Sequence, residues 1–311
     1  MRVSSDREAC SNRVRLVGAV SLGAVWLCVM SAGFVPLPTQ GEFVLGQRPF
    51  SPSSSWNTPV AAGAEYTKLN WPAPKGYNYS VAWESYSPSI RQGSASDPLV
   101  SVAYPAGWGY AGGLLHVRMP LDASGAAGTD GELLVIEGDV VHNFWQFKRQ
   151  GVNVAAAQSY GEANLLKDSG WGDRSRGAGI TAAGASQLAG LLVQAETDRG
   201  EIEHALQISI ERSLAKPGHS GEAIASDGKN PIGILQEGDR LAIPPETDMP
   251  SGLSPLGQKV FRAYQKFGAF VVDVAGGVTN LRAQANAYDE QTITLLRRDT
   301  AKLTPLLERV Q

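Results

Sequence analysis

The segment from Gly131 to Arg149 constrains the fold of this chain more than any other. Its halves read GELLVIEG (131–138) and DVVHNFWQFKR (139–149), two runs rich in β-branched and aromatic residues. Gly138 and Asp139 lie between the runs, and such a pair is typical of a tight turn, so the segment predicts a β-hairpin. The 311 residues also include 35 Gly and 18 Pro but only 4 Met, which favours many turns and short strands over a helical bundle.

The rest of the chain predicts further strands and a few helices. Strands are expected over 64–120, 200–210 and 269–277. The apolar run at 185–196 predicts a short helix. The segment 254–268 predicts an amphipathic helix, because Ser254 is a suitable N-cap and Gly268 a suitable stop.

The C-terminal residues 289–310 predict a charged helix with leucines at helical spacing and a break or kink at Pro305. The sequence contains no internal repeat and no convincing linker after residue 60, so one domain is the simplest organisation. The expected fold is mainly β, a jelly-roll-like β-sandwich over residues 41–285 with short inserted helices. A helical C-terminal tail over 286–311 then follows and could contact a partner.

The N-terminal residues 1–40 are typical of an export signal. Four arginines lie within the first 15 residues, and an uncharged run extends from Leu16 to Val35. Small residues at its end suit cleavage near 33–40, but the run is also long enough to stay in the membrane as an anchor. Either alternative makes the protein secreted or periplasmic, and it contacts the membrane only through residues 16–35 if the signal is uncleaved.

Cysteine use and charge narrow the possible chemistry and partners. Both cysteines, Cys10 and Cys28, lie in the export segment, so the exported domain can use neither disulfides nor thiol chemistry. The net charge of −3 leaves no excess of basic residues to displace counterions along a phosphate backbone. The sequence therefore predicts no nucleic-acid partner.

Four ordered blocks between residues 50 and 285 resemble a known family. They read SPSSSWNTPV, TDGELLVIEGDVVHNFWQFKR, GAGITAAGASQLAGLLVQAETDRGEIEHALQISI and GLSPLGQKVFRAYQKFGAFVVDVAGG. In this order they resemble a widespread family of secreted, mostly uncharacterised bacterial β-sandwich proteins. The resemblance implies a sandwich fold and an extracellular polysaccharide as partner, by analogy from fold. The chain departs from the family pattern at His142 and Asn143, where members often carry an acidic residue, and around His219, where they carry a denser His/Asp cluster.

The second strand of the predicted hairpin carries polar groups on both faces, which indicates that it lines a groove. Alternation places His142, Gln146 and Lys148 on one face, with Trp145 on the other. These residue types suit β-elimination, which needs a carboxylate neutraliser beside a proton-abstracting group. The complete candidate set consists of His142, Gln146, Lys148, Tyr160 and Arg174 for catalysis, and Trp108, Trp145, Trp171 and Arg176 for substrate binding.

Hydrolysis of a glycosidic bond is the alternative reaction, and it needs two carboxyl groups that face one another across the sugar. The candidates are Glu84, Glu132, Glu137, Asp139, Glu162, Asp173 and Glu203. No pair of them sits on a recognisable motif. The first hypothesis is therefore a polysaccharide-cleaving enzyme, with lyase slightly ahead of hydrolase.

Two further interpretations remain at this point. A metal site could use His204, His219 and Asp227, but no recognised ligand spacing is present, so no metal or other cofactor is predicted. His204 is expected to be a core histidine. The second functional hypothesis is a non-catalytic carbohydrate-binding or envelope protein, in which several exposed tryptophans stack on sugar rings.

Overall fold

The computed structural model describes residues 43–311 apart from 75–77, 108–110 and 174–178. The chain divides into two units, Met1–Thr39 and Gln40–Gln311, and the described residues all belong to the second. The predicted export segment, Trp108, Arg174 and Arg176 lie outside the described residues. Among the residues described, no helix is both long and apolar enough to cross a bilayer.

The fold is mainly β, as predicted, and its largest element is a mixed seven-stranded sheet. In spatial order its strands are β1 (Tyr66–Thr67), β17 (Glu308–Val310), β14 (Arg240–Ala242), β15 (Ala269–Ala275), β11 (Leu206–Glu211), β16 (Thr279–Arg282) and β2 (Tyr79–Ala82). Strands β11 and β15 at its centre are parallel. Strand β15 is mostly apolar, and both strands are mostly buried, as expected for strands covered on both faces.

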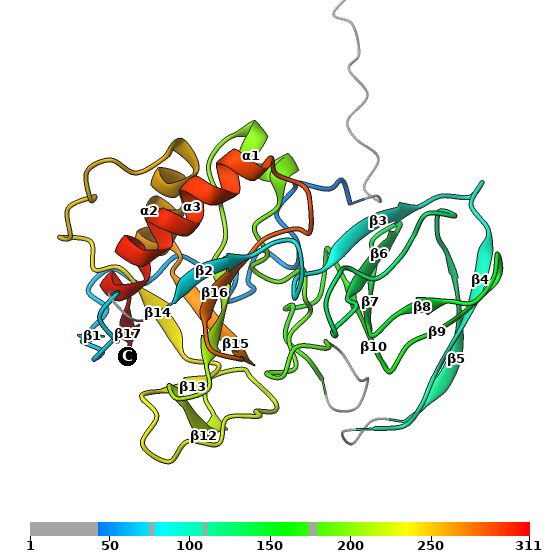
Figure 1. The fold of residues 1–311 in the computed structure, drawn as a ribbon, viewed down its shortest axis with the longest axis horizontal. Coiled ribbons are helices and arrows are strands. Elements are labelled where there is room, and N and C mark those ends of the chain that lie inside the picture. The colour runs from blue at the N-terminus through cyan, green and yellow to red at the C-terminus, as the bar shows by residue number, and fades with distance from the viewer. Residues whose placement is uncertain (1–42, 75–77, 108–110, 174–178) are drawn as a thin grey trace, which may run out of the picture. The chain divides into compact units, whose positions relative to one another are not determined.

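Two helices share a hydrophobic core with this sheet (Figure 1). Helix α2 (Pro255–Lys266) is amphipathic and begins as predicted, because the Ser254 hydroxyl accepts a hydrogen bond from the Gly257 amide at 3.0 Å. It ends at Gly268, whose φ of 78° only glycine adopts without strain. Helix α3 (Glu290–Leu303) is capped in the same way by the Asp289 carboxylate.

Two four-stranded sheets pack against each other as a β-sandwich. The first contains β10 (Ser159–Asn164), β7 (Val140–Trp145), β6 (Leu133–Glu137) and β3 (Ser89–Gly93), and the second contains β5 (Gly113–Arg118), β4 (Leu99–Tyr104), β9 (Val154–Ala156) and β8 (Lys148–Arg149). Val102, Leu133 and Phe144 belong to the core that the two sheets share. Leu134 and Val141 point to the opposite face of the first sheet and pack with Phe270 of β15. The first sheet is therefore buried on both faces.

The predicted hairpin is confirmed. Strands β6 and β7 are antiparallel, with Glu137 paired to Val140 across the Gly138–Asp139 turn, where Gly138 has a φ of 62°. The remaining elements are short: β12 (Ala215–His219), β13 (Leu235–Glu237), α1 (Gln194–Arg199) and a 3₁₀ turn (Thr304–Leu306).

The predicted C-terminal helix is confirmed by α3, but the helix predicted over 185–196 and the separate C-terminal tail are not found. Residues 187–190 of the run 185–196 form a turn, and the helix α1 covers only Gln194–Arg199. Gly190 adopts a φ of 75°, which is not helical, and it packs so closely on Trp56 that any side chain there would clash. The C-terminal segment 286–311 is not a separate tail, because β17 follows α3 and pairs with β1 and β14 inside the seven-stranded sheet.

Candidate functional site

A cavity of about 440 Å³ lies where segments from several parts of the chain meet. Its described lining residues are Asp130, Glu132, Trp145, Ser159, Gly179, Ile180, Thr181, Ala182, Gly184, Ala225, Ser226, Asp227, Asp273 and Val274. They come from the hairpin, from the glycine-rich segment after 178, from the loop before β13 and from β15. Acidic residues dominate its polar lining, and Trp145 provides an aromatic wall.

Asp273 reaches this cavity because of an irregularity in β15. Ile208 of β11 pairs with Val271, but the next residue, Ser209, pairs with Asp273, so Val272 is an extra residue on β15. An extra residue of this kind changes the direction in which the following side chains point. The Asp273 carboxyl group therefore points from an apolar strand into the cavity, and its side chain is 30% exposed.

Arg282 lies behind Asp273 and links it to the hairpin. The Arg282 side chain is buried, with a relative exposure of 2%. Its Nη2 donates to Glu132 Oε1, and Gln187 Nε2 donates to the same oxygen. Its Nη1 lies 3.5 Å from Asp273 Oδ2. One guanidinium thus faces two carboxyl groups, one fully buried and one open to the cavity.

Asp273 also belongs to a second group of acids. One carboxyl oxygen each of Asp227, Glu237 and Asp273 lie within 4.8 Å of one another. Glu237 is buried and its Oε2 accepts a hydrogen bond from the Asp227 amide at 2.8 Å, whereas the Asp227 side chain is exposed. Three carboxyl groups so close together cannot all ionise easily.

The pKa values of these acids are displaced accordingly. Burial raises the pKa of Asp273 to about 8, against the opposing effect of Arg282. Burial also raises the pKa of Glu237 to about 7, and the neighbouring Asp227 adds to this shift. Burial raises the pKa of Glu132 as well, with Arg282 acting against it, and burial also raises the pKa of Asp227. The cavity therefore holds one carboxyl group, that of Asp273, that carries a proton near neutral pH, which is the property of a general acid.

The three converging carboxyl groups do not fit a metal ion well. Carboxylate oxygens suit Ca²⁺ or Mg²⁺, but those ions need about six oxygen ligands. The Arg282 guanidinium also lies 3.5 Å from Asp273 Oδ2, and its fixed positive charge opposes a second cation. We therefore interpret Asp227, Glu237 and Asp273 as acids. The set considered from the sequence is not brought together, because neither His204 nor His219 joins Asp227.

The residues predicted for β-elimination lie on different parts of the fold. Strand β7 ends at Trp145, and Gln146 has a φ of 52°, so the alternation does not continue to Lys148. Gln146 Nε2 donates to the Thr129 carbonyl at 3.2 Å, and Lys148 is exposed on β8 in the other sheet. The prediction that His142, Gln146 and Lys148 share one face is therefore wrong.

His142 and Tyr160 do lie together, in a cluster with Glu162. The Tyr160 hydroxyl donates to Glu162 Oε2 at 2.6 Å and lies 2.8 Å from His142 Nδ1. Burial lowers the pKa of His142, and burial together with the Glu162 contact raises the pKa of Tyr160. The pair packs beside Phe144, which is on the sandwich-core face of β7. Neither residue is among the described residues that line the cavity.

The tryptophans separate into core and cavity residues. Trp171 is buried, lies 4.9 Å from Trp56 between ring centroids, and donates from Nε1 to Ser55 Oγ, so its predicted role in substrate binding is wrong. Trp83 is buried too, and the Trp71 Nε1 donates to the Leu307 carbonyl. Trp145 alone among the described tryptophans lines the cavity. Its role in substrate binding stays a prediction.

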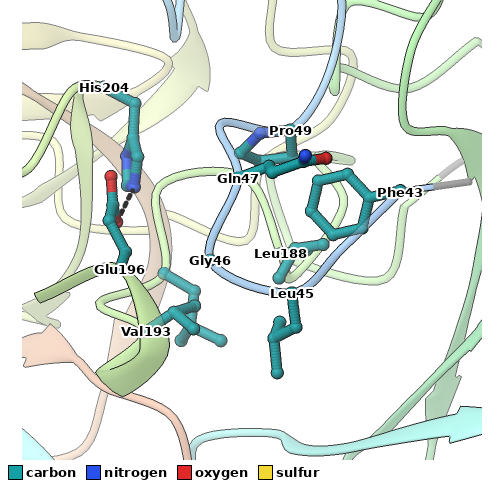
Figure 2. A pocket seen from close by; sticks show the side chains of 10 residues that line it. Phe43, Leu45, Gly46, Gln47, Pro49, Leu188, Val193, Glu196 and His204 are labelled. Atoms are coloured by element: carbon teal, nitrogen blue, oxygen red, sulfur yellow. Dashed lines mark hydrogen bonds and ion pairs between the residues drawn. The ribbon is translucent and has the colours of Figure 1, made fainter. Parts of the chain in front are cut away.

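His204 is a core histidine, as expected. Its Nε2 lies 2.9 Å from Glu196 Oε2 and its Nδ1 lies 2.8 Å from the Ala205 carbonyl. Figure 2 shows the His204–Glu196 pair beside a small pocket lined by Phe43, Leu45 and Leu188. That pocket holds only about 10 Å³, roughly one water molecule, so it cannot admit a substrate.

Comparison with protein-family models, with curated proteins and with solved structures finds no match to this chain. The resemblance described above therefore stays a prediction. Asp273, Glu237 and Arg282 were not singled out from the sequence. For Asp273 the signal that could have found it is a charged residue inside an apolar strand, as in AFVVDVA, whereas the strand TNLR gives no such signal for Arg282. Such residues are rarely buried without a partner or a function.

Proposed function

We propose that this protein hydrolyses a glycosidic bond of an extracellular polysaccharide in the cavity beside Trp145. The observation that carries the proposal is the pair of Asp227 and Asp273 carboxyl groups, with oxygens within 4.8 Å, in a cavity where the pKa of Asp273 is raised to about 8. Glycoside hydrolysis needs one carboxyl group that is protonated at the working pH and a second that is ionised.

The roles of the two aspartates follow from their surroundings. Asp273 is the acid, and it donates its proton to the glycosidic oxygen as the bond from that oxygen to the sugar C1 breaks. Asp227, the more exposed of the two, is the carboxylate that attacks C1 and forms a glycosyl ester. Water then hydrolyses the ester while ionised Asp273 takes up its proton. The nearest oxygens of Asp227 and Asp273 lie within 4.8 Å of each other, below the roughly 6.5–9.5 Å of inverting enzymes, which must admit a water between the carboxyl groups, so we expect retention.

The composition of the cavity supports hydrolysis over β-elimination. Elimination from a uronic acid needs a group that neutralises the substrate carboxylate and a base for the C5 proton. The described lining residues include no Arg, Lys, His or Tyr, and four of them are acidic. An acidic wall repels a uronate, whereas it stabilises the positive charge that develops on a sugar ring during hydrolysis.

The size and lining of the cavity also suit a sugar. About 440 Å³ lies within the usual range for small-molecule sites, roughly 300–1,000 Å³. The Trp145 ring offers a face on which a sugar ring can stack. Export through residues 1–40 and a jelly-roll form of the sandwich belong to the same proposal, since both are expected of a secreted carbohydrate-active protein.

The test is to incubate the purified protein with neutral and acidic polysaccharides and to measure new reducing ends and the ultraviolet absorbance of unsaturated sugars in parallel. We expect reducing ends without absorbance, and a fall in rate of roughly 10²–10⁴-fold in Asp273→Asn, because general acid catalysis is lost. Glu84→Gln, which changes an exposed carboxylate elsewhere, is the matched control and should keep full activity.

Two other results would replace this proposal. Absorbance from unsaturated ends would identify a lyase. Binding of a polysaccharide without either signal would identify the non-catalytic carbohydrate-binding protein, and mutation of Trp145 to Ala should then weaken that binding.

A further inference from the structure

Arg282 is the least expected residue near the cavity. It ends strand β16, and it is buried among Glu132, which precedes β6, Gln187, from the turns before α1, and Asp273 of β15. Burying a guanidinium is costly unless nearby anions and hydrogen-bond acceptors compensate for the loss of water. Segments that are distant in sequence therefore meet around one fixed positive charge.

The guanidinium contacts its two carboxyl partners unequally. Its Nη2 hydrogen-bonds Glu132 Oε1, which also accepts from Gln187 Nε2. The second contact, from Nη1 to Asp273 Oδ2, is 3.5 Å long. Charge-assisted N–H···O bonds are usually about 2.7–2.9 Å, so the contact with Asp273 is weak. Two donors on one Glu132 oxygen stabilise the ionised form of that carboxyl group.

We propose that Arg282 is a positioning residue for the hydrolysis. It pairs with ionised Glu132, which neutralises the guanidinium charge, so that Asp273 is the carboxyl group that keeps its proton. The transfer of that proton to the glycosidic oxygen rests on the proposed function, whereas the protonation of Asp273 in the free protein does not. Arg282 itself exchanges no proton during the reaction. A guanidinium suits this role better than an ammonium, because it stays charged and its separate nitrogens reach both carboxyl groups.

The other charged groups around Asp273 act in the same direction. Asp227 and Glu237 approach it from the loop before β13 and from β13 itself, and Glu132 lies across Arg282. Each of these carboxyl groups favours the protonated form of Asp273, as burial does, and Arg282 is the opposing group. Whether Asp273 is protonated near neutral pH therefore depends on whether Glu132 already neutralises the charge of Arg282.

The variant Glu132→Gln tests this balance. Glutamine keeps the shape and one acceptor oxygen but removes the charge, so Asp273 becomes the nearest carboxylate partner of Arg282. We expect the pKa of Asp273 to fall and the basic limb of the kcat/KM profile to move down by at least about one pH unit, since an adjacent cation lowers a carboxyl pKa by roughly that much or more. A purely structural role would lower the rate at every pH without moving the limb.

A measurement on the unmodified protein keeps the inference testable if Glu132→Gln does not fold. Carboxyl ¹³C NMR should show one aspartate that titrates near pH 8 and disappears in Asp273→Asn. An Asp273 that is ionised at neutral pH, or a Glu132→Gln profile that matches that of the control Glu84→Gln, would overturn the inference. Because the NMR titration needs no substrate, failure to cleave any polysaccharide would refute the proposed function and leave this result standing.

Discussion

Two buried titratable clusters in this protein differ in what surrounds them. The His204–Glu196 pair has a partner on both histidine nitrogens, and its side chains are only 3% and 8% exposed, although Glu196 also borders an open cavity of about 450 Å³. The Arg282–Asp273 cluster faces a cavity of about 440 Å³, and one carboxyl oxygen each of Glu132 and Glu237 is buried without a hydrogen-bond partner among the described residues.

The difference separates a structural cluster from a functional one. A nearly fully buried pair whose hydrogen bonds are satisfied holds segments together and offers no free group to a ligand. An incompletely satisfied cluster beside an open cavity destabilises the fold, and such strain is typical of sites where substrate completes the interactions. The two clusters should therefore respond to substitution with opposite signs.

The largest effect is expected at the buried His204–Glu196 pair. In Glu196→Ala the His204 imidazole and the Glu203 amide both lose their acceptor, so the free energy of unfolding should fall by about 3 kcal/mol. Urea unfolding followed by fluorescence measures this change. The control is Glu201→Ala, which removes an exposed ion pair with Arg262 and should cost less than about 1 kcal/mol. Equal losses of unfolding free energy in the two variants would mean that the buried His204–Glu196 pair stabilises the fold no more than an exposed ion pair does.

Substitution in the cluster of Arg282 and Asp273 should instead raise the free energy of unfolding. The raised pKa of Asp273 means that the folded state holds a proton that the unfolded state releases above about pH 4, so this group loses stability as the pH rises towards about 8. The Asp273→Asn variant has no ionisable group at this position, so it does not lose stability in this way as the pH rises. We expect the variant to be more stable than the unmodified protein by at least about 1 kcal/mol at pH 8, the equivalent of one pKa unit, and to gain little at pH 4. Thermal unfolding at both pH values measures it, and a destabilised variant at pH 8 would contradict it.

A smaller effect concerns the pH dependence of the buried His204–Glu196 pair. Burial acts to lower the pKa of His204, but Glu196 outweighs it and the pKa is raised. The pair therefore contributes its full stability below the unfolded pKa of about 6.5, and loses it as the pH rises through the folded value. The difference in unfolding free energy between the unmodified protein and Glu196→Gln should accordingly shrink between pH 6 and pH 9. A difference that stays constant would mean that His204 is neutral throughout.

The parts of the fold that the sequence predicts well depend on local signals. The hairpin is marked by Gly138, and helix α2 by Ser254 at its start and Gly268 at its end, all within a few residues of the elements they define. The turn at 187–190 cannot be predicted from the local sequence, because the packing of Gly190 on Trp56 is a tertiary contact. An apolar run does not reveal such a contact.

The candidate site was harder to predict for the same reason. Glu132 is a candidate from the sequence, but its partners Gln187 and Arg282 lie 55 and 150 residues away and reach it only when distant segments of the fold pack together. The direction of Asp273 depends on the bulge at Val272, which no residue type in the strand announces. Tryptophan content likewise could not distinguish Trp171 in the core from Trp145 at the cavity.

The smallest effect on kcat/KM is expected at Lys148, one of the residues that the sequence predicts to be catalytic. Lys148 is exposed on β8, and it is not among the described residues that line the cavity. If the reaction takes place at Asp273, Lys148→Ala should change kcat/KM by less than about twofold, because an exposed side chain away from the substrate contributes little. Reducing-end assays beside Asp273→Asn measure the contrast. A large loss in Lys148→Ala with activity retained in Asp273→Asn would move the reaction from the cavity back to the sandwich strands.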